Sequence, residues 1–127
     1  MDKRVIRTEA APAPFQGAPY NQAIVVGELV FVAGQLGLEP GDTSIEGDVA
    51  TQTGQALSNL AAILEAAGSS MDKLVKTSVF LLDLADFQAM NEVYGTRVGS
   101  QPPARSTFQV AALPSGARVE IEAVAHL

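Results

Sequence analysis

The hydrophobic residues of this chain alternate with polar ones in some stretches and recur every three or four residues in others, so we expect both strands and helices. The first half of the chain predicts three strands, over residues 5–8, 23–26 and 29–35. Gly27-Glu28, between the second and third runs, fits a two-residue hairpin turn with glycine first. Gly34 lies inside the third run and indicates either a close approach by a ligand or another backbone, or a β-bulge.

The apolar residues between 49 and 67 follow the stripe of an amphipathic helix. Asp48 is the expected N-cap of this helix, and Gly68 is its expected C-terminal stop. Glycine inside a helix costs about 1 kcal/mol relative to alanine, so Gly54 indicates tight packing at its position.

The second half predicts a strand over 74–82 that is buried on both faces, then a second helix capped by Asp83 or Asp86. The inner face of that helix is expected to carry Phe87, Met90, Val93, Tyr94 and Val98. The last two strands are predicted over residues 104–111 and 119–125. The order βββαβαββ indicates a single α+β domain over residues 1–127, with the helices on one face of a sheet.

The last two predicted strands carry charged residues among apolar ones. Arg105 shares a face with Thr107, and Glu120 lies opposite Val119 and Ile121. A charge inside a strand is costly unless it is paired or used. Arginine can grip a ligand carboxylate with two parallel hydrogen bonds, and a nearby glutamate can move a proton. The pattern favours such a site no more than a structural pair between Arg105 and Glu120.

A simple hairpin between these two strands would separate the two charges. With a turn about Ser115, position 105 would lie opposite 125, and Glu120 would be roughly 16 Å along the ladder from Arg105. A shared site therefore requires the last strand to pair elsewhere in the sheet. Otherwise the two residues serve different purposes, and periodicity alone leaves both arrangements open.

The composition excludes several kinds of chemistry. The chain has no cysteine, which excludes disulfides, thiolate metal sites and a cysteine nucleophile. His126 is its one histidine, so neither a Ser-His-Asp relay nor a multi-histidine metal site can be assembled. The net charge is −6 and the basic residues are scattered, which disfavours nucleic-acid binding.

Hydropathy bears on location and assembly. No stretch approaches about 20 apolar residues, so we expect no membrane span. The N-terminus leads into a strand-like segment rather than the apolar core of a signal peptide, so a cytoplasmic protein is expected. Hydrophobic residues make up 47% of the chain and charged residues only 17%, which suggests that other subunits cover part of its apolar surface.

The C-terminal half carries the strongest motif of the chain, Pro103-Ala104-Arg105-Ser106 followed by Val119-Glu120-Ile121-Glu122-Ala123. Further stretches match in the same order: Ala18-Pro19-Tyr20-Asn21-Gln22-Ala23, Val32-Ala33-Gly34-Gln35 and Val75-Lys76-Thr77-Ser78-Val79-Phe80-Leu81. Together the matches extend over nearly the whole chain. The chain therefore resembles the RidA/YjgF/UK114 family of reactive intermediate deaminases.

The resemblance implies a chorismate-mutase-like fold, also called YjgF-like, with a mixed sheet and assembly into a homotrimer with clefts between subunits. In this fold the final strand lies antiparallel between two parallel strands, which would allow Arg105 and Glu120 to face one cleft. It also implies a substrate class, the reactive enamines and imines released by pyridoxal-phosphate enzymes. The typical substrate is 2-aminoacrylate, which tautomerises to 2-iminopropanoate and is hydrolysed to pyruvate and ammonia.

The resemblance further implies roles for individual residues. Arg105 would hold the substrate carboxylate, and Glu120 would orient water and transfer protons, with no metal or cofactor needed. Four further residues match family positions that line the cleft: Tyr20, Gly34, Asn91 and Thr107. Each also has a purely structural interpretation: a loop aromatic for Tyr20, a bulge for Gly34, a solvated helix residue for Asn91 and a wall residue for Thr107.

The chain departs from the family pattern in three places that border the cleft. Many members have cysteine where this chain has Thr107, and many have serine where it has Ala33. The segment 94–103 is about three residues shorter than usual. These differences leave the preferred imino acid open.

Three other functions compete with the deaminase. The first is a non-catalytic trimer that binds small 2-oxo or imino carboxylates and acts through a partner. The second is a ribonuclease or translation inhibitor, which the acidic charge disfavours. The third is a chorismate mutase, which rests on the fold alone and has only one cleft arginine for a dicarboxylate.

Overall fold

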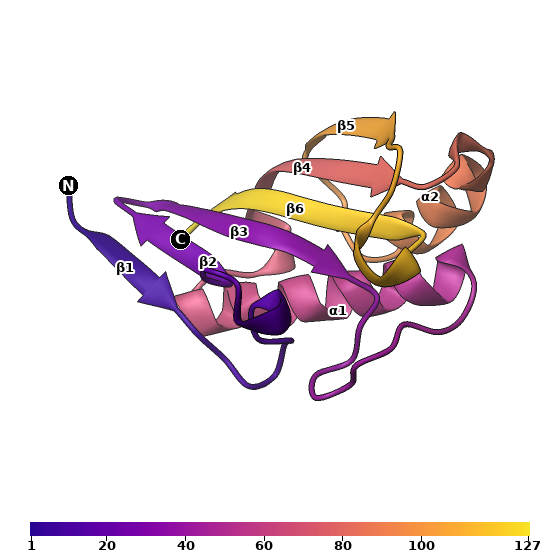
Figure 1. The fold of residues 1–127 in the computed structure, drawn as a ribbon. Helices are drawn as coiled ribbons and strands as arrows, with labels where there is room; N and C mark the ends of the chain where they lie inside the picture. The colour runs from indigo at the N-terminus through magenta and orange to yellow at the C-terminus, as the bar shows by residue number, and fades with distance from the viewer.

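The computed structural model describes residues 1–127. Its six strands are β1 (Lys3–Ile6), β2 (Ala23–Val26), β3 (Leu29–Leu36), β4 (Leu74–Leu81), β5 (Ala104–Gln109) and β6 (Val119–His126). Its two α-helices are α1 (Val49–Ala67) and α2 (Phe87–Gly95). The strands form one mixed sheet, and α1 runs along one face of it (Figure 1). The predicted order βββαβαββ and the α+β class are confirmed.

The last strand of the chain lies in the middle of the sheet. The strand order is β1-β2-β3-β6-β4-β5, and β6 is antiparallel to both of its neighbours, β3 and β4. Strand β5 pairs in parallel with β4 alone, so it forms one edge of the sheet. The simple hairpin between the last two strands is therefore not formed, and the arrangement implied by the family resemblance is confirmed.

Packing is confined to the helix side of the sheet. Residues of α1 such as Leu60 and Ile63 are fully buried against strand residues such as Val30, Val79 and Ile121. No helix covers the opposite face, where Phe31 of β3 and Phe108 of β5 are 45% and 54% exposed. The expectation that residues 74–82 are buried on both faces is therefore wrong, because both helices pack on the same side.

The ends of α1 follow the local signals in the sequence. The Asp48 carboxylate accepts a hydrogen bond of 2.9 Å from the backbone N–H of Thr51, and Gly68 ends the helix at φ 89°. Gly54 is not tightly packed. A Cβ atom added there would lie 3.8 Å from Cγ1 of Val93, which is an ordinary van der Waals distance.

The end of strand β1 and the start of helix α2 are set by contacts with residues that are distant in the sequence. Strand β1 ends at Ile6 because the N–H of Thr8 donates to the side-chain oxygen of Gln22 at 2.7 Å rather than to a neighbouring strand. Asp83 caps a short 3-10 turn, whereas Asp86 is the N-cap residue of α2, as one of the two alternatives predicted. The Asp86 side chain makes no capping hydrogen bond and instead forms an ion pair of 2.9 Å with Arg118. Neither helix is long and apolar enough to cross a membrane.

Candidate active site

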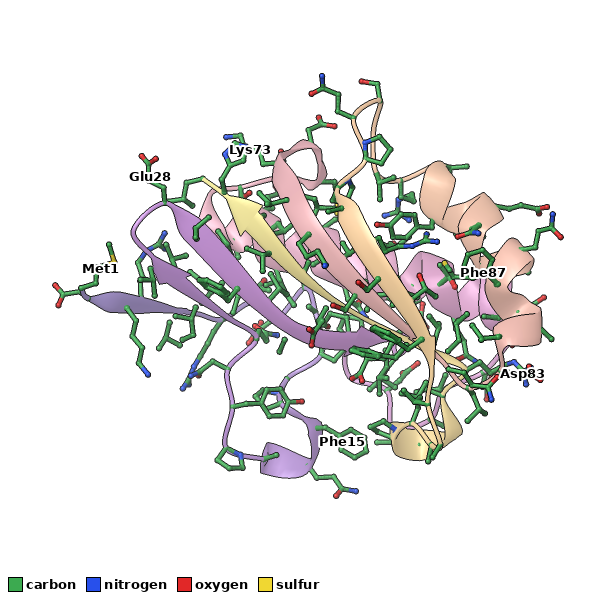
Figure 2. The ribbon with its side chains drawn as sticks, turned by 90° about the horizontal axis from the view of Figure 1, so that it is seen from above. Met1, Phe15, Glu28, Lys73, Asp83 and Phe87 are labelled. Atoms are coloured by element: carbon green, nitrogen blue, oxygen red, sulfur yellow. The ribbon has the colours of Figure 1, made fainter.

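Arg105 projects from the edge strand β5 toward the helix side of the sheet. Its register partner on β4 is Thr77, which is fully buried beneath α2. The guanidinium carbon lies 4.8 Å from the ring centroid of Tyr94 and 5.5 Å from that of Phe87, both on α2. Both are cation–π distances. Figure 2 shows Phe87 on α2 near this edge of the sheet.

The guanidinium of Arg105 has no anionic partner in the protomer. The ion pair of the chain joins Arg118 to Asp86, and the other guanidinium hydrogen bonds come from Arg4 and Arg97. The N–H groups of Arg105 are thus available to a ligand, and the structural pair between Arg105 and Glu120 is not formed. A fixed cation with unengaged donors is suited to binding a carboxylate.

Two further predicted residues lie on the same side of the sheet. Thr107 follows Arg105 by two residues on β5, so it has the same face, and it is half-buried. Asn91 lies on α2 between Phe87 and Tyr94, and its Oδ1 is buried without a hydrogen-bond partner. A buried acceptor without a partner in the chain is uncommon, and it is able to accept a hydrogen bond from a bound molecule. We call Arg105, Thr107 and Asn91 the arginine half-site.

Glu120 lies in β6 on the opposite, uncovered face of the sheet. It lines a cleft of about 410 Å³ together with Tyr20, Gly34 and five apolar or small residues, Phe15, Ala18, Ala33, Leu36 and Pro114. The cleft is formed where the N-terminal loop passes the end of β3. We call Tyr20, Gly34 and Glu120 the glutamate half-site.

Gly34 makes room for the Glu120 carboxyl. It lies in a bulge of β3, where the register to β6 shifts between Val32 and Gln35. A Cβ atom added to Gly34 would lie 2.6 Å from Oε2 of Glu120, which is too close for a real contact. The predicted bulge at Gly34 is therefore present, and the group that approaches it closely is the Glu120 side chain rather than a ligand or another backbone.

The hydroxyl of Tyr20 is oriented by the loop that carries it. The backbone N–H of Phe15 donates to the Tyr20 hydroxyl oxygen at 2.6 Å. The hydroxyl hydrogen is then free to donate to a molecule in the cleft, which Tyr20 lines as a 42% exposed residue.

The surroundings of Glu120 favour the neutral form of its carboxyl over the ionised form. Burial raises the pKa of Glu120, and the negative charge of Glu122 on the same face raises it further. A carboxyl with a raised pKa can take up and return a proton closer to neutral pH. Glu122 itself forms no ion pair with Lys76 or Arg118.

The two half-sites do not meet within one protomer. The register partner of Arg105 on β4 is Thr77, whereas the register partner of Glu120 is Phe80, three residues further along β4. An odd offset places the two side chains on opposite faces of the sheet. Three residues along the strands and two strands across each correspond to about 10 Å. Within one protomer the position of β6 therefore does not bring Arg105 and Glu120 to one cleft, and the expected cleft between subunits stays a prediction.

The sequence pattern missed the aromatic residues around Arg105. Phe87 and Tyr94 were expected only to fill the inner face of the second helix, yet Phe87 is 42% exposed and both rings contact the guanidinium. Their spacing of seven residues, two helical turns, was the available signal, because it places both rings on one stripe of α2.

Comparison with known proteins places these observations in context. Residues 8–127 match the family model described as Endoribonuclease L-PSP. The human protein named 2-iminobutanoate/2-iminopropanoate deaminase is 45% identical over 124 residues, which cover 97% of this chain and 89% of that protein. A crystal structure of RidA from the Antarctic bacterium Psychrobacter has a TM-score of 0.93 and 41% identity, covering 98% of this chain and 99% of that one. The structure of Escherichia coli TdcF with bound serine has a TM-score of 0.91 and 38% identity, covering 98% of both chains.

Proposed function

This chain belongs to the Endoribonuclease L-PSP family, the group of RidA and its relatives, and from that premise we propose that it is a hydrolytic deaminase of reactive enamines and imines. The substrate is 2-aminoacrylate and its tautomer 2-iminopropanoate, and the products are pyruvate and ammonia. One observation carries the proposal: the Arg105 guanidinium lies over two aromatic rings with no anion of its own protomer to bind. The name of the human relative and the serine bound to TdcF support a small substrate with a carboxylate.

The reaction needs three functions from the protein. Arg105 binds the substrate carboxylate through two parallel hydrogen bonds. Glu120 accepts a proton from water as the water oxygen bonds to the imine carbon, and passes this proton to the imine nitrogen, giving a neutral carbinolamine. Glu120 then takes the proton of the carbinolamine hydroxyl and delivers it to the nitrogen, so that the carbon–nitrogen bond breaks, ammonia leaves and the carbonyl of pyruvate forms. Tyr20 donates its hydroxyl hydrogen to the water or the substrate.

The proposed catalytic unit is a homotrimer. The arginine half-site of one protomer meets the glutamate half-site of the next, so that every cleft contains one Arg105 and one Glu120. The placement of these residues on opposite faces of one sheet supports this arrangement, because a second chain is needed to bring them together. The exposed aromatic residues Phe31 and Phe108 on the uncovered face support it as well. A cytoplasmic location without nucleic-acid partners is part of the same proposal.

The test is release of pyruvate and ammonia from 2-aminoacrylate generated in situ by a dehydratase. We expect Arg105→Ala to lose most of the acceleration, because the carboxylate is no longer held. Arg4→Ala is the matched control, since Arg4 is a strand arginine at the opposite edge of the sheet. An Arg105→Ala variant as fast as the wild type would refute the carboxylate-binding role.

Glu120→Gln separates the deaminase from the non-catalytic binder. The glutamine keeps the shape of the side chain but cannot transfer a proton. The deaminase predicts loss of turnover, in line with the roughly 10²–10⁴-fold that a positioned acid–base group contributes, with binding of 2-oxo acids retained. A binder predicts that calorimetry detects 2-oxo acids while the wild type and Glu120→Gln are equally inactive.

A further inference from the structure

The Arg105 guanidinium lies against two rings of α2. Phe87 and Tyr94 are seven residues apart, about two helical turns, so their side chains leave α2 on the same side. The guanidinium carbon lies 5.5 Å from the Phe87 ring centroid and 4.8 Å from that of Tyr94, and both are cation–π distances. The two rings therefore restrict where the guanidinium can lie.

Tyr94 is anchored at the level of Arg105. Its hydroxyl forms a hydrogen bond of 2.6 Å with the hydroxyl of Thr77, and both residues are buried. Thr77 is the register partner of Arg105 on the adjacent strand. The strand pair that places the arginine therefore also fixes the ring beneath it.

We propose that Phe87 and Tyr94 are positioning residues that hold the Arg105 guanidinium in place to bind the substrate carboxylate, with Thr77 fixing the Tyr94 ring. We call Phe87, Tyr94 and Thr77 the aromatic platform. The platform rests on the proposed carboxylate-binding role of Arg105. It acts on substrate through Arg105, so its loss weakens binding more than it slows the chemical steps.

The rings are expected to strengthen ligand binding because they reduce the side-chain entropy that Arg105 loses when it binds a ligand. A free Arg side chain loses much rotamer entropy when it binds a ligand, whereas a stacked one is already ordered. Stacking on aromatic rings in a partly desolvated position corresponds to about a 3- to 30-fold change in an equilibrium constant. This sets the size of the effect expected from removing a ring.

The experiment measures pyruvate binding by calorimetry, together with KM and kcat for 2-aminoacrylate hydrolysis. Tyr94→Leu is expected to raise the Kd for pyruvate and the KM about 3- to 30-fold, with a smaller change in kcat. Tyr94→Phe keeps the ring, so it is expected to restore most of the affinity. In an Arg105→Ala background, Tyr94→Leu is expected to have no further effect, because the ring acts through the arginine.

Phe87→Leu keeps the proposal testable if Tyr94→Leu does not fold, because Phe87 is 42% exposed and lies outside the core cluster. It is expected to raise the Kd for pyruvate, and Phe87→Tyr is expected to restore it. Unchanged pyruvate affinity in the ring-removing variants that fold would overturn the platform. A loss of pyruvate affinity on Tyr94→Leu that is equally large in the wild-type and Arg105→Ala backgrounds would also overturn the platform. If the wild type binds pyruvate but releases none from 2-aminoacrylate, the deaminase proposal is contradicted. The calorimetric comparison of the ring variants still decides whether the platform positions Arg105.

Discussion

Arg105 and Glu120 lie on opposite faces of the same sheet, in strands that are separated by β4. Arg105 faces the helix layer, and Glu120 faces the uncovered side, where it lines a cleft with Tyr20. A reaction that needs both groups must therefore draw them from two chains. In the proposed trimer, this relationship would make assembly necessary for catalysis, and mixing two variants tests it.

Mixed assemblies of two inactive variants should regain activity. If each cleft takes Arg105 from one protomer and Glu120 from the next, an equal mixture of Arg105→Ala and Glu120→Gln chains restores about a quarter of the clefts. The measurement is the rate of pyruvate release after the two variants are refolded together. Activity that stays at the level of the separately refolded variants would contradict a site shared between chains.

The acidic side of the pH–rate profile should depend on Glu122. Burial raises the pKa of Glu120, and the Glu122 charge raises it further. Glu120 must be ionised to accept a proton from water, so the rate rises with pH through its pKa. Glu122→Gln removes a negative charge, lowers the pKa of Glu120 and moves the rising limb to lower pH.

The measurement for Glu122 is the pH dependence of kcat/KM for the wild type and for Glu122→Gln. Glu65→Gln, an exposed glutamate of α1, is the control and should leave the profile in place. A shift of the limb to higher pH in Glu122→Gln would contradict the electrostatic account.

The sequence predicts those features of the fold that depend on neighbouring residues. Asp48 and Gly68 define the two ends of α1 because a cap acts within one helical turn. The alternation of β6 correctly separates Ile121, which is buried, from Glu120 on the other face. These signals are local, so no knowledge of the partner strands is needed to read them.

The pattern of hydrophobic and polar residues could not predict the features of the fold that depend on distant segments. The position of β6 between β3 and β4 follows from pairing across the whole chain, and only the family resemblance indicated it. The end of β1 depends on the Gln22 amide, which also donates to the carbonyl oxygens of Ala11 and Pro12. Likewise, periodicity placed Tyr94 on an inner face but could not show that Arg105 lies against its ring.

Gly34→Ala should reduce activity with little loss of stability. The added Cβ would lie 2.6 Å from Oε2 of Glu120, so the flexible carboxyl must move away. A misplacement of about 1 Å can cost about 10²-fold in rate. We expect a loss of that order in kcat, measured with 2-aminoacrylate, and an almost unchanged urea midpoint. Wild-type kcat in Gly34→Ala would show that the position of Glu120 is not critical.

Asp48 should make the stability of α1 depend on pH. The Thr51 N–H bonds to the Asp48 carboxylate, which lowers the pKa of Asp48 below its usual 3.8. Stability from a lowered pKa is present above the usual value and is lost as pH falls through the lowered value. Asp48→Asn keeps an acceptor but does not titrate, so its thermal midpoint should fall less than that of the wild type between about pH 5 and pH 2. Equal falls would contradict the cap.

Two glycine-to-alanine changes that meet α1 should have opposite effects on stability. Gly54 lies inside α1, and an added Cβ would lie at an ordinary 3.8 Å from Val93, so Gly54→Ala should stabilise the protein by about 0.5–1 kcal/mol. At Gly37 an added Cβ would lie 2.6 Å from the backbone Cα of Gln52, so Gly37→Ala should destabilise it by about 1–3 kcal/mol. Urea midpoints at one fixed protein concentration provide the measurement, because the proposed assembly would make stability concentration-dependent. A lower midpoint for Gly54→Ala would mean that neighbouring chains, rather than α2, pack against that position.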